Sequence, residues 1–318
     1  MPKTSDPGPL SLGIDIGGTK AHGVVLDAAD RVLAQHLLPT EPTGQGVRRT
    51  VLAVASGLAG ALGIGLGDYS SVGLGIPGFV DHNLGVVETA VNLGITHTDL
   101  AGLLAADFRV AARVENDVKA TALGAGLVLG KTHRDLVYVN LGTGVAAAAI
   151  SNGRLVRGAR NGAGEIGHLV IEPSGELCAC GQRGCLETVL GGAHLTRRLD
   201  RLGSDLERLG GDPRPVAVAE ADRIVSALAS AVTLVVITYD SAAVVLGGGI
   251  LRGADWLRPR LEDELRGRAF GSPFLAGLAV ADRLVELPDE IPVAAIGAAV
   301  VGRKKELRAR AEHLVTGG

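Results

Sequence analysis

One pattern occurs twice in this sequence: a short apolar strand that ends in a glycine turn. Residues 14–19 read Ile-Asp-Ile-Gly-Gly-Thr, and residues 139–144 read Val-Asn-Leu-Gly-Thr-Gly. Each copy is followed by a second apolar run, a turn and a third run, which predicts a β-meander. In the second copy the turn is Ser-Asn-Gly at 151–153, and Asn-Gly between apolar runs is a strong hairpin signal. This weak internal duplication predicts two related domains that face each other.

Length and composition agree with two domains and narrow the classes of function. The chain has 318 residues, of which 47% are hydrophobic, and this is more than one ordinary core accommodates. A net charge of −3 is not the basic footprint of a nucleic-acid-binding protein. Apolar stretches such as 227–237 are too short to span a bilayer, and residues 1–9 lack the apolar run of a signal peptide. We therefore expect a cytoplasmic protein with no nucleic-acid or membrane partner.

Apolar periodicity predicts the remaining helices and strands. The segments with helical spacing are 50–62, 100–107, 118–129, 217–237, 256–268 and a last helix from Pro292 to about His313. The apolar runs that predict further strands are 72–76, 111–115 and 242–246. Strands and helices are thus mixed along the whole chain.

The first glycine turn carries side chains suited to a phosphate group. Asp15 lies near the end of the predicted strand, and the turn continues with Gly17, Gly18, Thr19 and Lys20. Glycines let backbone N–H groups approach phosphate oxygens, the threonine hydroxyl can donate a hydrogen bond, and the lysine adds positive charge. The aspartate would lie near Mg²⁺ or its waters. A plain hairpin turn with a solvated aspartate is the alternative, since short glycine motifs are weak signals.

Two later glycine turns extend this interpretation to a nucleotide. The turn at 142–144 repeats the first one, and a phosphate chain that is held from both sides needs two such loops. The three glycines at 247–249 follow an apolar strand and would let adenine or its ribose pack on bare backbone. Tight turns that bind nothing are the alternative in both places.

The tripeptide Glu115-Asn116-Asp117 lies at a predicted strand-to-helix junction. A sugar hydroxyl that attacks a phosphoryl group needs a base to accept its proton, and a carboxylate at a strand end can do this. Asp117 can also be the N-cap of the following helix. Local sequence alone favours the N-cap interpretation.

His168, Cys178, Cys180 and Cys185 form the most specific pattern in the chain. They supply one imidazole and three thiolates, which is a full tetrahedral shell for Zn²⁺, and the chain has no other cysteine. The alternatives are three buried thiols with an unrelated histidine, or a Cys178–Cys180 disulfide, which would be strained at that spacing. Because four protein ligands close the shell, the predicted zinc is structural and not the catalyst.

Two glutamates flank this cluster. Glu165 precedes it in Gly-Glu-Ile-Gly-His, and Glu187 follows the last cysteine by two residues. Carboxylates accept hydrogen bonds from sugar hydroxyls with good directionality, and a metal loop that fixes both would preorganise a sugar pocket. The alternative is a pair of solvated surface glutamates.

The order of these motifs resembles the ROK family, which includes bacterial glucokinases, related sugar kinases and sugar-responsive repressors. The matching segments, in chain order, are Asp-Ile-Gly-Gly-Thr-Lys, Gly-Ile-Pro-Gly, Glu-Asn-Asp, Leu-Gly-Thr-Gly, Gly-Ala-Gly-Glu-Ile-Gly-His, Cys-x-Cys-Gly-x-x-Gly-Cys-x-Glu and Gly-Gly-Gly. The resemblance runs from the region of Leu12 to the final helix. Its most specific parts are the cysteine segment and the Glu-x-Gly-His segment.

The resemblance implies an α/β fold of two actin-like (ribonuclease H-like) domains around a central cleft. It places 1–117 and 292–318 in a small N-terminal domain with the first phosphate loop. Residues 118–291 would form a larger domain with the second phosphate loop, the zinc site and the adenosine site. A homodimer or homotetramer is expected.

The resemblance also implies an activity, the ATP-dependent phosphorylation of a hexose at its 6-hydroxyl, with glucose as the first candidate. It makes Asp117 the general base, which overturns the local preference for the N-cap, and it implies ATP, Mg²⁺ and a structural Zn²⁺ as cofactors. The residues implied to contact the sugar are Gly78, Asn116, Asp117, Glu165, His168 and Glu187. Those implied to bind ATP are Asp15, Gly17, Gly18, Thr19, Lys20, Gly142, Thr143, Gly144, Gly247, Gly248 and Gly249.

Three departures from the family pattern leave the sugar open. Residues 145–148 are Val-Ala-Ala-Ala where further glycine is usual, 188–192 lack the usual aromatic and Ser-Gly, and the region around Asn92 lacks a nearby tryptophan. The alternatives are a kinase for N-acetylmannosamine, N-acetylglucosamine, fructose or allose, and polyphosphate in place of ATP as donor. A non-catalytic sugar sensor is the alternative of another class, although only about a dozen residues precede the first strand, too few for a helix-turn-helix unit.

Overall fold

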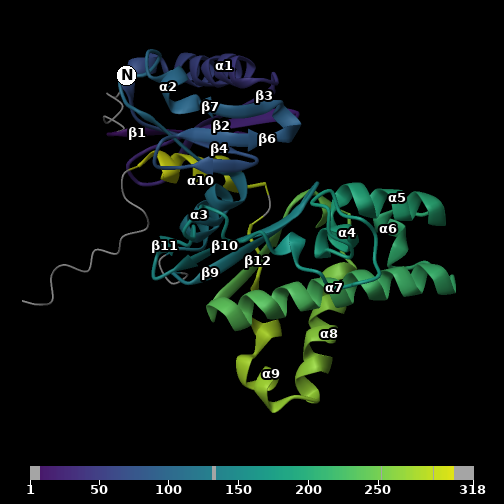
Figure 1. The fold of residues 1–318 in the computed structure, drawn as a ribbon. Helices are drawn as coiled ribbons and strands as arrows, with labels where there is room; N and C mark the ends of the chain where they lie inside the picture. The colour runs from purple at the N-terminus through teal and green to yellow at the C-terminus, as the bar shows by residue number, and fades with distance from the viewer. Residues whose placement is uncertain (1–7, 131–133, 252, 289, 304–318) are drawn as a thin grey trace, which may run out of the picture. The chain divides into compact units, whose positions relative to one another are not determined.

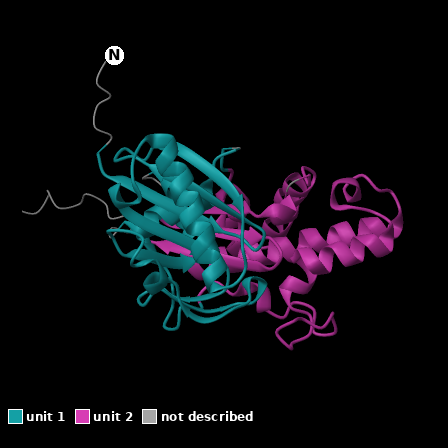
Figure 2. Cartoon of the chain, turned by 90° about the horizontal axis from the view of Figure 1, so that it is seen from above, with its two compact units in different colours: residues 1–134, 152–162, 287–318 teal, residues 135–151, 163–286 magenta. Residues whose placement is uncertain are grey.

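The computed structural model describes residues 8–130, 134–251, 253–288 and 290–303 (Figure 1). The predicted extension of the last helix to His313 lies outside these residues. The chain divides into two compact units (Figure 2). Unit 1 comprises 1–134, 152–162 and 287–318, and unit 2 comprises 135–151 and 163–286.

The helix that follows Asn116 marks where the unit boundary differs from the predicted domain boundary. We expected 118–134 to open the second domain, whereas α3 (Asp117–Leu129) belongs to unit 1. The reason is its packing against α10 (Val293–Gly302), the C-terminal helix of unit 1. A Cβ on Gly297 of α10 would lie only 1.8 Å from Ala120 O of α3. The absence of a side chain there lets the two helix backbones touch.

Unit 1 is built on a mixed five-stranded sheet. Its strands lie in the order β3 (Val32–Pro39), β2 (Lys20–Leu26), β1 (Leu10–Ile16), β4 (Tyr69–Ile76) and β8 (Ala112–Asn116). β1 pairs antiparallel with β2, and β2 with β3, which confirms the meander predicted around the first glycine turn. β1, β4 and β8 run parallel to one another, so their carboxyl ends lie at the same end of the sheet.

Helices cover both faces of this sheet (Figure 1). α1 (Gly44–Leu62) and α2 (Leu100–Leu104) share one apolar core with the sheet. Gly23 of β2 faces α1, because a Cβ there would lie 2.3 Å from Val54 Cγ1. Gly13 of β1 faces α10, because a Cβ there would lie 2.2 Å from both Ala295 O and Ala299 N. α10 therefore packs on bare strand backbone, opposite the face that α1 covers.

A second five-stranded sheet repeats the strand order of the first. It contains β11 (Arg154–Leu155), β10 (Val145–Ser151), β9 (Leu136–Leu141), β12 (Ala243–Gly247) and β13 (Leu284–Val285), in that order. β9 pairs antiparallel with β10 and parallel with β12, which pairs parallel with β13. Counted along the chain within each sheet, both sheets have the order 3-2-1-4-5. The duplication predicted from the two glycine turns is confirmed.

The helices of unit 2 are α4 (Leu186–Leu190), α5 (Gly192–Leu202), α6 (Leu206–Leu209), α7 (Pro215–Tyr239), α8 (Leu257–Phe270) and α9 (Pro273–Leu278). α7 packs on β9 and contacts α4, α6 and α8. Among the described residues it is the one helix long and apolar enough to cross a membrane, which the apolar run 227–237 did not lead us to expect. Of its apolar window, 56% is buried inside the structure, as in the core helix of a compact unit.

A small three-stranded sheet in unit 1 is absent from the predictions. It consists of β5 (Phe79–Asp81), β6 (Val86–Ala90) and β7 (Ile95–Asp99), paired antiparallel in that order. β6 reads Val-Val-Glu-Thr-Ala and β7 reads Ile-Thr-His-Thr-Asp, so neither is a continuous apolar run of the kind from which the other strands were predicted. Short 3-10 helices lie at Leu66–Asp68, Val91–Leu93, Ile166–His168, Gly249–Leu251 and Val280–Arg283.

The close contact of α3 and α10 gives a stability prediction. We expect Gly297→Ala to destabilise the protein by at least about 2 kcal/mol, because the added methyl group overlaps Ala120 O in a packed contact. Gly60→Ala is the matched control, since Gly60 is also a helical glycine of unit 1 and a Cβ there meets nothing within 4 Å. This control should equal the wild type or exceed it by up to about 1 kcal/mol. Equilibrium urea unfolding measures both, and equal stabilities of the two variants would contradict the packing described.

Candidate functional site

In unit 1, three of the predicted site segments lie at the carboxyl ends of parallel strands. The pairing of β1 with β4 sets Asp15 opposite Gly75, and the pairing of β4 with β8 sets Gly75 opposite Glu115. Asn116 is opposite Ile76, the last residue of β4. Segments that are far apart in the sequence therefore meet at one end of the sheet.

Gly75 lets two carboxylates approach each other. A Cβ at this position would lie 3.5 Å from Asp15 Oδ1 and 3.6 Å from the Cα of Asp117. Burial of the Asp15 carboxyl, followed by repulsion from Asp117, raises the pKa of Asp15 to about 7. The Asp15 side chain makes no hydrogen bond or ion pair within the described residues. A close pair of carboxylates with one raised pKa is typical of a site that holds a cation or transfers a proton.

Asn116, not Asp117, is the N-cap of α3, so the local N-cap interpretation of Asp117 is wrong. Asn116 Oδ1 accepts the backbone N–H of Lys119 at 3.1 Å, and Asp117 is the first helical residue. The side-chain nitrogen of Asn116 donates to Asp117 Oδ1 at 3.0 Å and to Gly78 O at 3.1 Å. Asp117 Oδ1 also accepts the backbone N–H of Val118 at 2.9 Å. These contacts fix the orientation of the Asp117 carboxylate.

Gly78 cannot be replaced by a residue with a side chain without moving the neighbouring strand. Its φ is +102°, a conformation that favours glycine, and a Cβ there would lie 1.9 Å from Thr89 O on β6. The turn between β4 and β5 thus lies directly on the small sheet. This packing holds the Gly78 carbonyl where the Asn116 amide reaches it.

Buried charged residues next to Asp117 hold the segment that follows β11, through contacts that were not predicted from the sequence. Arg157 Nε donates to Glu115 Oε2 at 2.7 Å, and the Glu115 side chain is only 2% exposed. Lys119, also buried, donates from Nζ to Asn161 O at 2.7 Å. Buried charges require such partners. Each partner lies 42 residues away in the sequence, so no local pattern could reveal it.

The first glycine turn is accessible to a ligand. Gly17 N–H donates to Lys20 O at 2.8 Å, which closes the turn between β1 and β2. Gly18, Thr19 and Lys20 are exposed. The carbonyl oxygen of Thr19 accepts a hydrogen bond from the backbone N–H of Thr40 at 3.0 Å. The side chain of Thr19 takes no part in this backbone hydrogen bond. The hydroxyl and the amine predicted to contact phosphate are therefore at the surface of unit 1.

In unit 2, the turns at 142–144 and 247–249 lie together at the carboxyl ends of β9 and β12. Gly248 has a φ of +104°, and a Cβ there would lie 2.2 Å from Leu141 O. Gly142, Thr143 and Gly249 line one pocket, whose volume is about 880 Å³. The other wall of this pocket comes from α5 and the loop after it, with the polar residues Thr196, Arg197, Asp200, Ser204 and Asp205. This second wall was not predicted, because the pattern of an amphipathic helix does not show which part of its polar face lines a pocket.

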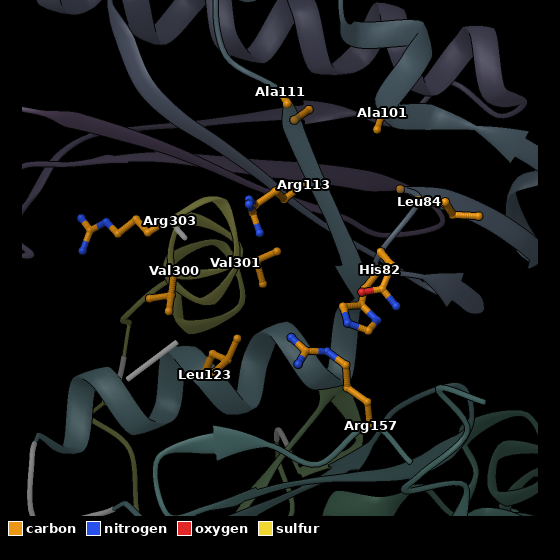
Figure 3. A pocket seen from close by; sticks show the side chains of 13 residues that line it. His82, Leu84, Ala101, Ala111, Arg113, Leu123, Arg157, Val300, Val301 and Arg303 are labelled. Atoms are coloured by element: carbon orange, nitrogen blue, oxygen red, sulfur yellow. The ribbon is translucent and has the colours of Figure 1, made fainter. Parts of the chain in front are cut away.

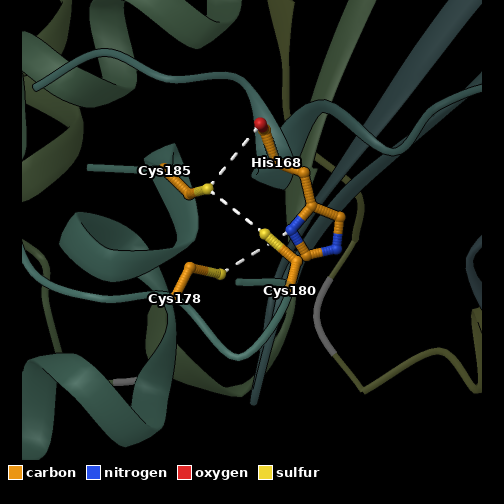
Figure 4. Close-up of side chains that lie close together, drawn as sticks. All are labelled: His168, Cys178, Cys180 and Cys185. Atoms are coloured by element: carbon orange, nitrogen blue, oxygen red, sulfur yellow. Dashed lines mark hydrogen bonds between the residues drawn. The ribbon is translucent and has the colours of Figure 1, made fainter. Parts of the chain in front are cut away.

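His168 and the three cysteines come together in unit 2 (Figure 4). Their ligand atoms all lie within 4.8 Å of one another. Cys178 Sγ is 3.8 Å from His168 Nδ1, and Cys180 Sγ is 3.6 Å from Cys185 Sγ. Tetrahedral zinc with bonds of about 2.3 Å to sulfur separates its sulfurs by about 3.8 Å. The donors and their spacing therefore fit a closed zinc site, and the cysteines form no disulfide.

The cysteine loop is tied to α7. A Cβ on Gly184, whose φ is +72°, would lie 1.5 Å from Glu172 O, so the loop lies directly on the segment before it. Glu172 forms a two-pronged ion pair with Arg223 of α7, with both N–O distances 2.7 Å. The hydrogen bonds from Arg223 lower the pKa of Glu172. A central helix of unit 2 thus supports the cysteine loop.

The two predicted sugar glutamates are placed differently. Glu187 lies against the second glycine turn: its Oε2 accepts the N–H of Val145 at 3.0 Å, and a Cβ on Gly144 would lie 2.5 Å from that oxygen. Glu165 is exposed and lies one turn before His168, whose N–H donates to Glu165 O at 3.2 Å. The structure thus brings Glu187 to the second glycine turn and keeps Glu165 next to His168 of the cysteine cluster.

Comparison with known proteins decides the family. A sequence model of the ROK family matches residues 11–283. This protein belongs to the ROK family. The family predicted from the motifs is confirmed, and the match extends over most of the chain.

Individual relatives of this ROK protein include glucokinases. The glucokinase of Streptomyces coelicolor is 35% identical over 189 residues, which span 59% of this chain and 58% of that protein. The glucokinase of Thermotoga maritima is 30% identical over 284 residues, or 80% of this chain and 86% of that protein. A solved structure of a ROK family glucokinase from Streptomyces griseus in complex with glucose and AMPPNP has a TM-score of 0.75 and 26% identity, and covers 93% of this chain and 100% of that one. The predicted actin-like α/β fold is confirmed.

The carboxylate pair of this ROK protein predicts a dependence of stability on pH. The pKa of Asp15 is about 7 in the folded protein against an ordinary value of 3.8, so between these values the folded state keeps a proton that the unfolded state releases. The stability that the protonated carboxyl contributes is therefore lost as pH rises from about 4 towards 7. We expect the free energy of unfolding of Asp15→Asn, minus that of the wild type, to increase as the pH rises from about 5 to about 8. Urea unfolding without Mg²⁺ or nucleotide measures this difference.

A control separates this effect from a general change in charge. Asp263→Asn alters an exposed carboxylate on α8, and its stability should follow that of the wild type over the same pH range. If the pH profiles of Asp15→Asn and the wild type were parallel, Asp15 would not be the group responsible.

Proposed function

We propose that this protein is an ATP-dependent hexose kinase that phosphorylates the 6-hydroxyl of glucose, with Asp117 as the general base. The observation that carries the proposal is the placement of the Asp117 carboxylate. It is oriented by Asn116 and by the N–H of Val118, and it lies beside the enclosed carboxyl of Asp15. The similarity to glucokinases supports glucose as the acceptor.

In the proposed reaction the 6-hydroxyl oxygen of the sugar attacks the γ-phosphorus of ATP. Its proton passes to the Asp117 carboxylate, and the bond between the γ-phosphorus and the oxygen that bridges it to the β-phosphorus breaks as ADP leaves. Mg²⁺, when bound, neutralises charge on the β- and γ-phosphates. Asp15 is the residue that would hold it, since its oxygens have no protein partner in the described chain and Mg²⁺ prefers carboxylate oxygens.

The sugar contacts that we propose are Gly78, Asn116, Glu165, His168 and Glu187, besides Asp117. For Asn116 the hydrogen bonds limit the kind of contact. Both hydrogens of its side-chain amide are engaged, by Asp117 and by the Gly78 carbonyl. Oδ1 accepts one N–H and keeps room for one more donor. Asn116 therefore accepts a hydrogen bond from a sugar hydroxyl and does not donate one.

The pocket in unit 2 favours ATP over polyphosphate as the phosphoryl donor. Beyond Gly142 and Thr143, the charged residues among its described lining are Asp200, Asp205 and Arg197. Carboxylates accept hydrogen bonds from the hydroxyls of ribose, whereas they repel a chain of phosphates. A nucleoside therefore suits this wall, and the glycine turns at 142–144 and 247–249 are proposed to hold the phosphates and the adenosine.

A kinase for another hexose or for an N-acetylhexosamine is the second candidate. Residues 145–148 favour it, since the side chains of Val145, Ala146, Ala147 and Ala148 occupy positions where glycine is usual, next to the bond between Val145 and Glu187. A non-catalytic sensor would not need the oriented base that Asp117 provides. The expected cytoplasmic location and the expected homodimer or homotetramer stay predictions.

The role of Asp117 gives the first test of the proposal. We expect Asp117→Asn to lower kcat for glucose phosphorylation at least about 100-fold, since the amide cannot accept the proton, while glucose affinity measured by calorimetry stays within a few-fold. Asp263→Asn, an exposed change on α8, should keep the kcat of the wild type. Turnover by Asp117→Asn at a rate close to that of the wild type would rule out Asp117 as the base.

Zinc at His168, Cys178, Cys180 and Cys185 is proposed as a structural part of the sugar site. We expect about one zinc per chain by elemental analysis of the purified protein, and loss of that zinc in Cys180→Ser. Cys180→Ser should also raise KM for the sugar, because the loop that carries His168 would no longer be fixed. Arg183→Ala, in the same loop but outside the cluster, should keep its zinc. Equal zinc content in Cys180→Ser and the wild type would contradict the assignment.

A further inference from the structure

Unit 1 contains a pocket that the proposed reaction does not use (Figure 3). Its volume is about 690 Å³, and it lies along β8, the edge strand of the sheet. It borders Ala111, Ala112 and Arg113 at the start of β8, whereas Asp117 follows the last residue of that strand. The pocket is thus separated from the proposed base by the length of β8. Its apolar wall is formed by Leu84, Ala101, Leu123, Val300 and Val301.

The polar lining of this pocket is cationic. Arg113 of β8, Arg157 of the loop after β11, Arg303 at the end of α10 and His82 line it, and no aspartate or glutamate is among its described lining residues. Figure 3 shows Arg113 and Arg157 extending from opposite sides into the same space, next to Val301, whereas Arg303 points away from it. Arg303 is also occupied elsewhere, because it pairs with Asp30. The two guanidinium groups that face the space are therefore those of Arg113 and Arg157.

Glu115 pairs with one of these two guanidinium groups, that of Arg157. Glu115 lies two residues after Arg113 on β8 and so points to the same face of the sheet. Its Oε2 accepts Arg157 Nε at 2.7 Å, and its Oε1 accepts the N–H of Asn116 at 3.0 Å. Arg113 forms no ion pair with any residue that the structure describes. Within the described residues, the positive charge of Arg113 at the pocket is therefore not paired with a carboxylate.

We propose that this pocket binds a phosphate group between Arg113 and Arg157, either as inorganic phosphate or as a phosphate monoester of a small sugar. The guanidinium fork matches phosphate oxygens in geometry and charge. β8 is the edge strand of the sheet, and within the described residues no strand pairs with its outer edge. The wall of leucine, alanine and valine side chains can contact the C–H groups of a sugar ring. The proposal does not depend on the kinase activity, since binding is measured directly.

The test is a calorimetric titration of the full-length protein with inorganic phosphate and, separately, with glucose 6-phosphate. AMP-PNP at saturating concentration occupies the nucleotide pocket of unit 2 during both titrations. We expect saturable binding, and we expect Arg113→Gln to weaken it at least about tenfold. Arg113→Lys should lose less, because it keeps the charge without the fork. Tighter binding of glucose 6-phosphate than of inorganic phosphate would identify the monoester as the preferred form, and the reverse order would identify the free ion.

The matched control is Arg109→Gln, another exposed arginine of unit 1 that does not line the pocket. It should bind both probes as the wild type does. Thermal unfolding checks that Arg113→Gln is folded, which is expected for an exposed side chain with no ion-pair partner in the described chain. The proposal is overturned if the wild type shows no saturable binding, if Arg113→Gln binds as the wild type does, or if Arg109→Gln loses affinity as strongly as Arg113→Gln.

Discussion

Across Gly75, the carboxyl groups of Asp15 and Asp117 lie close enough to repel each other, and burial together with this repulsion raises the pKa of Asp15 to about 7. The register of three parallel strands produces this pair, because it sets Asp15, Gly75 and Glu115 side by side. A divalent cation would relieve the repulsion, and a base next to it would accept a proton. The same strand ends also carry the Asn116 amide, which orients Asp117 and holds the turn at Gly78.

The second sheet has the same strand order as the first, but the residues near the end of its first strand differ in charge. Its first strand has Asn140 at the place that Asp15 has in the first copy, and the glycine turn follows in both. The turns of unit 2 instead line a pocket whose far wall is α5. Next to them, Glu187 accepts the N–H of Val145, and the Cys3His loop is supported through Glu172 and Arg223 on α7. The two sheets are thus similar scaffolds, and the first carries the acidic pair of Asp15 and Asp117.

The sequence predicts those parts of this protein that depend on local patterns. The two meanders, the helices α3 and α7 and the Cys3His spacing follow from apolar periodicity, glycine turns and ligand chemistry within short windows. The role of Asn116 as N-cap was not predicted, because Asn and Asp suit that position equally and only the backbone decides between them. The pairing of Arg157 with Glu115 and the wall formed by α5 join segments far apart in the sequence. Such contacts depend on tertiary packing, which no local pattern contains.

The proposed reaction transfers a phosphoryl group to the 6-oxygen of a hexose. The most direct measurement is NMR of reaction mixtures that contain the full-length protein, Mg²⁺-ATP and, one at a time, glucose, fructose, allose, N-acetylmannosamine or N-acetylglucosamine. We expect stoichiometric formation of ADP and of a hexose 6-phosphate, with glucose converted fastest. If the protein bound one of these sugars but formed no phosphorylated product from any of them, the kinase account would be contradicted and a sugar sensor favoured.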